Sequence, residues 1–197
     1  MLTLGRDVLP GWAVALIVYT DPAAVGFFFL GALMMLEKAE GVRTALATSP
    51  ADASTYLGGK VVTLTAIALV ACVVLLLVHR AAPYPLLLLA SVALTSIAFL
   101  GIGVPIALAF RTVNGYLVGS SSFLTPLIGP AFLALLDPMP LWLGIWPPVA
   151  QLRLILVAMG YASASWTELL MLLGVAALAA IAAMIFAQRS LIRELGK

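Results

Sequence analysis

Residues 34–60, MMLEKAEGVRTALATSPADASTYLGGK, form the longest polar stretch between apolar runs in this sequence. Apolar sequence leads into the stretch at Met34 and resumes at Val61. The charged residues between these two points are Glu37, Lys38, Glu40, Arg43, Asp52 and Lys60. Charged side chains are costly inside lipid. The stretch must therefore lie outside any bilayer that the flanking runs cross, and it sets the topology of the chain.

The composition indicates a membrane protein. Apolar residues make up 64% of the chain, charged residues 9%, and the mean hydropathy is +1.19. Soluble domains carry about 25% charged residues. Several apolar runs approach the ~20 residues that a helix needs to cross the hydrocarbon core. We therefore predict an all-α integral membrane fold, a polytopic bundle of about five transmembrane helices plus short re-entrant or interfacial helices.

The predicted transmembrane domain covers residues 1–197 as a single unit. Its expected spans are 11–36, 61–78, 86–110, 116–136 and 166–187. The loop 37–60 joins the first two spans. The segment 138–164 is apolar but broken by prolines, and we expect it to form re-entrant or interfacial helices, because irregular backbone at membrane depth needs protein or water around it. Trp142 and Trp146 are expected at headgroup level.

Asp21-Pro22 interrupts the first apolar run. Aspartate is a favoured N-cap and proline a favoured first helical residue, so the pair predicts a helix break with a helix starting at Pro22. The alternative is an intramembrane carboxylate on a transport path. Phe27 and Phe28 could line such a path or pack against lipid and core, and Ser121 could pack helices or contact a substrate.

Basic residues are distributed unequally between the two ends of the spans. Seven lie on one side and three on the other: Lys38, Arg43, Lys60, Arg111, Arg189, Arg193 and Lys197 against Arg6, Arg80 and Arg153. The positive-inside rule then places the loop 37–60 and the C-terminus in the cytoplasm and 138–164 outside. It also places the N-terminus outside. Because that is unusual without a cleaved signal, we expect a further span upstream of this chain.

Several motifs in order along the chain carry a resemblance to a known family. They are LEKAEGV at 36–42, LATSP at 46–50 and YLGGK at 56–60, with DP at 21–22, GFFFLGA at 26–32 and PPVAQ at 147–151. The first three resemble the first cytoplasmic loop of type-2 ABC transporter (ABC-2) permeases, and the others resemble the fluoroquinolone export branch. The chain departs from that family in lacking its elbow helix and first span, and in having Thr48-Ser49-Pro50 in place of Thr-Pro.

The loop itself suggests a short capped helix. Ser49 is a natural cap, Pro50 a good first residue, and Gly58-Gly59 would stop the helix after Leu57. In the family that the chain resembles, this is the coupling helix that contacts the ATPase subunit. The resemblance then implies partner contacts at Glu37, Glu40, Arg43, Pro50, Ala53, Tyr56 and Leu57. The alternative is a solvated loop with a surface helix.

The function implied by the resemblance is that of a permease subunit of an ATP-driven ABC exporter. It would move hydrophobic or amphipathic compounds, drugs such as fluoroquinolones among them, across the cytoplasmic membrane. Its partners would be a separate ATPase subunit, a second permease subunit and the lipid bilayer.

Nucleotide, metal and catalytic chemistry are not expected of this chain itself. Gly59-Lys60 is followed by Val61, where a P-loop needs serine or threonine, so ATP and Mg²⁺ would bind the partner. The single cysteine, Cys72, and the single histidine, His79, provide neither a metal cluster nor a catalytic base. A net charge of +2 gives no reason to expect nucleic acid. The alternatives are an intramembrane enzyme or an accessory membrane protein without transport activity.

Overall fold

The computed structural model describes residues 10–42, 53–79 and 82–195 of the chain. These residues form helices and connecting turns, and no strand occurs among them. Among the described residues, five helical stretches are long and apolar enough to cross a membrane: Gly11–Ala39, Ser54–Leu77, Pro85–Ala109, Val113–Leu135 and Trp166–Leu195. The prediction of an all-α polytopic membrane protein is therefore confirmed.

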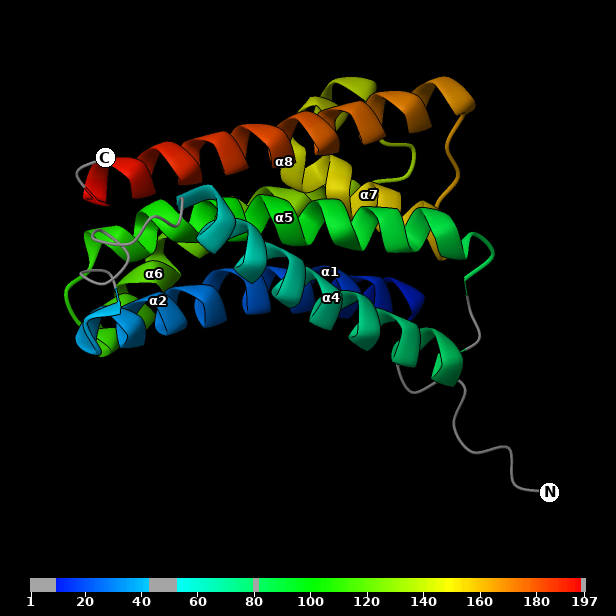
Figure 1. The fold of residues 1–197 in the computed structure, drawn as a ribbon. Helices are drawn as coiled ribbons and strands as arrows, with labels where there is room; N and C mark the ends of the chain where they lie inside the picture. The colour runs from blue at the N-terminus through cyan, green and yellow to red at the C-terminus, as the bar shows by residue number, and fades with distance from the viewer. Residues whose placement is uncertain (1–9, 43–52, 80–81, 196–197) are drawn as a thin grey trace.

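The bundle is arranged around α5 (Pro85–Ala109), which lies between α8 (Trp166–Leu195) on one side and α1 (Gly11–Ala24), α2 (Leu30–Ala39) and α4 (Ala53–His79) on the other (Figure 1). The most extensive helix contact is between α5 and α8. Gly101 allows this close approach, since a Cβ atom there would lie 2.6 Å from the carbonyl carbon of Ala183. Small residues at such crossings let membrane helices pack backbone to backbone.

The first span is one continuous helical stretch. Pro22 lies inside α1, and the chain continues through the π-helical turn η1 (Val25–Phe29) into α2. The predicted helix start at Pro22 is therefore wrong. A break at membrane depth would leave several backbone groups without partners, at a cost of several kcal/mol each, whereas proline inside a helix removes one hydrogen bond.

The second span is also continuous. α4 begins at Ala53 and runs through Gly58-Gly59 to His79, so the predicted helix stop at these glycines is wrong. Glycine in a helix interior costs only ~1 kcal/mol relative to alanine. The helix is extended by packing, because Leu57, Val61 and Leu64 are buried against the ends of α2 and α5.

The proline-rich segment folds into the middle of the bundle. α6 (Val113–Ile128) continues into the 3₁₀ turn η2 (Gly129–Leu135), followed by a second 3₁₀ turn, η3 (Leu141–Ile145), and by α7 (Pro147–Ala158). Every residue of α7 from Pro148 onward is buried, against α1, α5, α8 and η2. α7 is therefore a core helix although it is too short to cross a bilayer.

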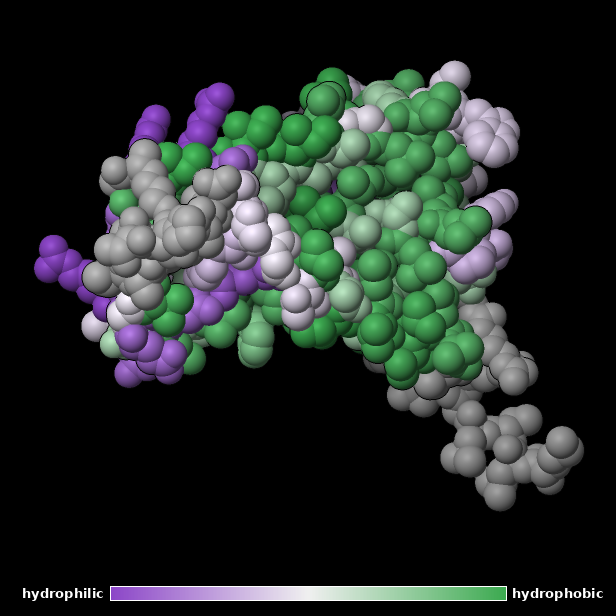
Figure 2. Space-filling view, in the orientation of Figure 1, coloured by the Kyte–Doolittle hydropathy of each residue, from purple (hydrophilic) through white to green (hydrophobic). Residues whose placement is uncertain are grey.

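Polar residues gather at one end of the bundle. The ends of α2 and α8 and the start of α4 lie together on the left of Figure 1. In the same orientation, Figure 2 shows hydrophilic residues at this end and hydrophobic residues over the centre and right. The described basic residues of this end are Lys38, Lys60, Arg111, Arg189 and Arg193. The exposed side chains of α4 include Val62, Val70 and Leu77, which are apolar and suited to lipid.

Candidate functional site

The two helices that flank the polar loop are joined by a cluster of three side chains. Glu37 lies near the end of α2, and Tyr56 and Lys60 lie one turn apart at the start of α4. The Lys60 Nζ atom is 2.5 Å from Glu37 Oε1, and the Tyr56 hydroxyl donates a hydrogen bond to Glu37 Oε2. The Lys60 ammonium also lies 4.7 Å from the centroid of the Tyr56 ring. We call these residues the loop clasp, since they hold α2 and α4 together where the loop begins and ends.

The clasp changes the expected set of partner contacts. Leu57 is 2% exposed and packs in the core, which contradicts its expected place on an exposed partner-binding helix. Tyr56 is half-buried in the clasp, while Glu40 is exposed just beyond α2. Arg43 and Pro50 lie outside the described residues, as does the side chain of Ala53. Of the predicted contacts, Glu37, Glu40 and Tyr56 therefore lie together at one end of the bundle.

Asp21 lies within the first span, ten residues after its first residue. At 1.5 Å per residue it is ~15 Å along the helix, near the depth of the bilayer centre. It is exposed on α1 and borders a hollow of about 150 Å³ that also contacts Ala68 and Cys72 of α4. A carboxylate at this depth remains a candidate for the transport path.

Pro22, also a predicted path or hinge residue, lines the same hollow as Asp21, whereas Phe27, Phe28 and Ser121 do not line it. Phe27 is fully buried and stacks on Tyr116 with ring centroids 6.3 Å apart, so it is a core residue. Phe28 is half-buried and packs edge-on against Phe27. Ser121 is exposed on α6, and its hydroxyl donates to the carbonyl of Val118 at 2.5 Å. The predicted path residues therefore do not form one site in this structure.

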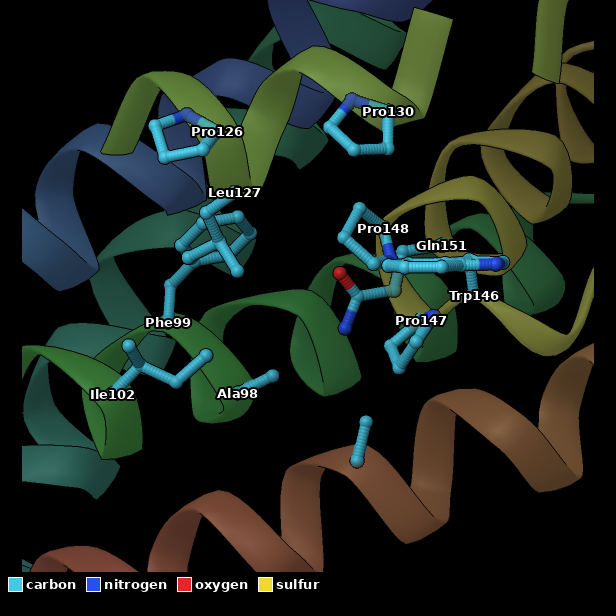
Figure 3. A pocket seen from close by; sticks show the side chains of 11 residues that line it. Ala98, Phe99, Ile102, Pro126, Leu127, Pro130, Trp146, Pro147, Pro148 and Gln151 are labelled. Atoms are coloured by element: carbon cyan, nitrogen blue, oxygen red, sulfur yellow. The ribbon is translucent and has the colours of Figure 1, made fainter. Parts of the chain in front are cut away.

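A cavity of about 250 Å³ lies between α5, α6, α7 and α8 (Figure 3). It is lined by Ala98, Phe99, Ile102, Pro126, Leu127, Pro130, Trp146, Pro147, Pro148, Gln151 and Ala179. The α5 residues of the lining lie close to the middle of that helix, so the cavity is within the membrane-spanning part of the bundle. The lining is apolar except for the amide of Gln151 and the indole N–H of Trp146.

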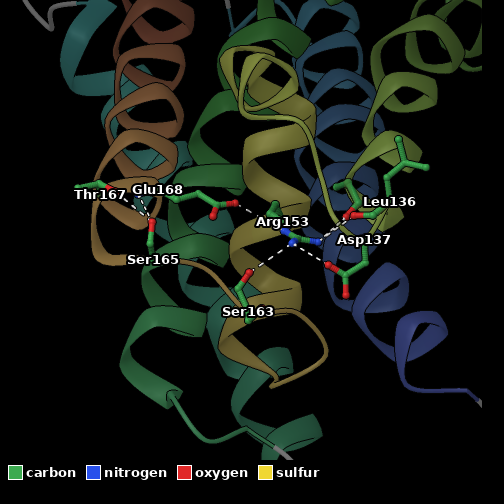
Figure 4. Close-up of polar contacts among 8 residues, drawn as sticks. Leu136, Asp137, Arg153, Ser163, Ser165, Thr167 and Glu168 are labelled. Atoms are coloured by element: carbon green, nitrogen blue, oxygen red, sulfur yellow. Dashed lines mark hydrogen bonds and ion pairs between the residues drawn. The ribbon is translucent and has the colours of Figure 1, made fainter.

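Buried Arg153 is the centre of a polar cluster, shown in Figure 4. The cluster includes the start of α8, which lies at the opposite end of the bundle from the end of α2, where the loop clasp is (Figure 1). Arg153 is 4% exposed. Its Nη1 atom donates to the carbonyls of Ala134 and Leu136, each at 3.2 Å, and Nη2 donates to the carbonyl of Ser163 at 3.3 Å. These bonds tie α7 to η2 and to the chain that leads into α8.

Two carboxylates complete the Arg153 cluster. Asp137 Oδ1 lies 3.7 Å from Nη2, and Glu168 Oε1 lies 4.0 Å from Nε. The Glu168 backbone N–H also donates a capping hydrogen bond to Ser165 Oγ at 3.2 Å, which fixes the start of α8. Sequence reasoning treated Arg153 as one charge of the outer side. The sequence does contain a signal for this cluster: Arg153 lies inside an apolar run, and acidic residues lie just outside that run on either side.

Metal binding is not suggested by the side chains in the described part of the chain. Across residues 10–42, 53–79 and 82–195, no group of three histidine, cysteine, aspartate or glutamate side chains is placed to hold a metal ion.

The comparisons with known proteins identify relatives that are transport proteins. The chain is 34% identical over 134 residues to the fluoroquinolone export permease proteins of two strains of Mycobacterium tuberculosis. The matched residues are 67% of this chain and 54% of each relative, so the chain spans about half the length of the relatives that it matches. No family model and no solved structure matches the chain. The similarity confirms the resemblance to this permease branch.

Proposed function

We propose that this chain is the membrane subunit of an ATP-driven ABC exporter, coupled through the loop 37–60 to a separate ATPase subunit that binds ATP and Mg²⁺. The transport path would be enclosed by two copies of this chain, or by this chain and a related permease. The cargo would be hydrophobic or amphipathic, as fluoroquinolones are, and the loop and the C-terminus would face the cytoplasm. The similarity to export permeases carries the proposal.

The loop clasp supports the proposed coupling. A push on a loop moves a membrane helix only if the loop is firmly attached at both ends. Glu37 on α2 is held by both Tyr56 and Lys60 on α4, so a force on the loop reaches two spans together. The charged pair has 19% and 12% of its side-chain surface exposed, so water screens it less than a surface pair.

The first experiment tests for the partner. The tagged chain is purified from membranes of its native host, and magnesium-dependent ATP hydrolysis is measured in the eluate. We expect hydrolysis by a co-purified ATPase subunit that mass spectrometry identifies, and no hydrolysis by the chain expressed alone. An eluate that holds no ATPase subunit would favour an accessory membrane protein.

The second experiment tests the coupling. Inverted vesicles that contain the purified transporter take up norfloxacin on addition of ATP, and uptake is followed by fluorescence. We expect Tyr56→Ala to reduce uptake per ATP hydrolysed at least fivefold, since it removes the ring and the hydrogen bond from the clasp. Tyr56→Phe, which removes only the hydrogen bond, should have a smaller effect.

The matched control for the coupling experiment is Tyr84→Ala. Tyr84 is 59% exposed and precedes α5 at the opposite end of the bundle from the clasp. Equal losses in Tyr56→Ala and Tyr84→Ala would contradict a specific role of the clasp, and normal coupling in Tyr56→Ala would contradict it as well.

A further inference from the structure

Gln151 presents a buried amide to the cavity between α5, α6, α7 and α8. The residue is 2% exposed, and within the described part of the chain its side chain has no hydrogen-bonding partner. Figure 3 shows the amide oxygen and nitrogen turned toward the middle of the cavity, between Phe99 and Trp146. The amide atoms are open to the cavity rather than fully enclosed, because the fully buried side-chain nitrogen and oxygen atoms without a partner in the described residues are Tyr19 Oη and Arg153 Nε. A polar group that faces an apolar cavity, where leucine would suit the lining as well, needs an explanation.

Water is a poor partner for this amide. A buried water molecule needs two to four polar partners, and cavities lined by apolar side chains stay dry. Apart from Gln151, the described residues of the lining contribute aliphatic, proline and aromatic side chains. The indole N–H of Trp146 belongs to a residue that is 56% exposed, and it can donate but not accept. A ligand that brings its own donor and acceptor fits the amide better.

We propose that this cavity binds a neutral, flat molecule of one or two fused rings that carries a hydrogen-bond donor and acceptor side by side, as a cyclic lactam does. Gln151 would pair with that edge through its carbonyl and its NH₂ group. The proposal rests on the exporter function above and assigns one class of ligand to this cavity; norfloxacin, whose ring nitrogen carries an ethyl group, lacks this donor and is not expected to pair with Gln151.

The size and walls of the cavity define the rings that fit. A cavity of about 150 Å³ binds benzene in an engineered protein. The present cavity of about 250 Å³ has room for a somewhat larger ring system. Aromatic rings prefer stacked or edge-on contacts with other rings, which Phe99 and Trp146 offer from opposite sides. Prolines from α6, η2 and α7 add flat apolar surface.

The charge of the lining defines the ligand further. No aspartate, glutamate, lysine or arginine is among the described residues that line the cavity. A charged group placed there would lose its hydration without gaining a counter-charge. The part of the ligand that enters the cavity must therefore be neutral.

The test is equilibrium dialysis of 2-quinolone, a fluorescent bicyclic lactam, against the purified chain in nanodiscs, with empty nanodiscs subtracted. N-methyl-2-quinolone is the matched probe, because it keeps the rings and the carbonyl but lacks the donor. We expect saturable binding of 2-quinolone that is about tenfold tighter than that of the N-methyl compound. Gln151→Leu should remove this preference. Gln188→Leu is the control, the same change at an exposed position of α8.

One further variant and one further measurement keep the outcome clear. Ala179→Leu narrows the cavity from α8 without altering the amide, and should weaken the binding of both probes. Gln151→Leu should unfold in detergent no more easily than the wild type, since its amide is unpartnered. A large loss of stability would assign Gln151 a structural role and overturn the proposal. So would equal binding of both probes, or unchanged binding in Gln151→Leu.

This experiment is independent of the coupling experiment. Dialysis uses the chain without ATP and without a partner, so failure to bind lactams leaves the exporter function standing. Lactam binding together with a chain that recruits no ATPase would instead leave the site standing and contradict the exporter function.

Discussion

The hydroxyl of Tyr116 on α6 donates a hydrogen bond to the backbone carbonyl of Phe27 in the π-helical turn of the first span. Both residues are fully buried. Gly31, one helical turn beyond Phe27, makes room for the ring: a Cβ atom at Gly31 would lie 1.9 Å from Tyr116 Cζ. The contact joins two spans that are far apart in sequence, and it depends on a tyrosine, a glycine and an irregular turn.

We predict that Gly31→Ala destabilises the chain by about 2 kcal/mol or more, because the added methyl group overlaps the buried Tyr116 ring and overpacking of this kind is costly. The measurement is the free energy of unfolding in detergent micelles, from titration with sodium dodecyl sulfate followed by circular dichroism. Gly174→Ala is the control, since a Cβ atom there meets no heavy atom within 4 Å. Equal stability of the two variants would contradict the described packing.

We predict that Lys60→Ala lowers the unfolding free energy by about 2 kcal/mol. This value lies between the ~1 kcal/mol of an exposed ion pair and the ~3 kcal/mol or more for breaking a buried one. The double variant Glu37→Lys/Lys60→Glu exchanges the two charges and should restore part of the lost unfolding free energy. The Tyr56 hydroxyl can accept as well as donate, so it can bond to either charged group. Lys38→Ala, at an exposed position, is the control. No recovery in the double variant would argue against the ion pair.

We predict that Arg153→Lys destabilises the chain by about 2 kcal/mol or more. The planar guanidinium reaches the carbonyls of Ala134, Leu136 and Ser163 together, whereas a lysine ammonium is a single point charge on a flexible stem. The same unfolding measurement applies. Arg189→Lys is the control on the exposed surface of α8 and should change little. If both variants unfold alike, the cluster at Arg153 does not hold α7 in place.

We predict that Glu40 and Ser163 face opposite sides of the membrane. The basic residues favour a cytoplasmic position for Glu40, which directly follows α2. Ser163 lies just before α8, and the end of α2 and the start of α8 lie at opposite ends of the bundle (Figure 1). Glu40→Cys and Ser163→Cys, each in a Cys72→Ala background, are treated with an impermeant maleimide in sealed vesicles of known orientation. Labelling of both from one side would refute this topology, and Cys72→Ala alone should not react.

Local sequence signals were misleading at two places. Asp21-Pro22 has the chemistry of a helix start, and Gly58-Gly59 has that of a helix stop. In water both would be reasonable positions for a helix end. The helices continue through both, because lipid gives a broken backbone no hydrogen-bonding partners and because Leu57 and Val61 gain buried contacts by continuing α4.

The site was predictable only in part. Glu37, Glu40 and Tyr56 were identified from the polar loop, and they do lie together at one end of the bundle. Their partner contact stays a prediction. Gln151 and Arg153 could be recognised in the sequence as polar residues in an apolar segment, but the local sequence does not determine which residues surround them. The cavity around Gln151 needs walls from four helices, and the bonds of Arg153 need two separate backbone segments, one around Ala134 and Leu136 and one at Ser163.

The sequence by itself determined the membrane class, the number of long apolar helices and the concentration of charge at one end. These follow from composition and run length, because the transfer of a side chain into lipid depends on that side chain and its near neighbours. The tertiary structure alone decided that α7 is a core helix, that Tyr116 bonds to the first span, and that Gln151 is buried without a partner. Those properties depend on contacts between residues far apart in the chain, so no local pattern contains them.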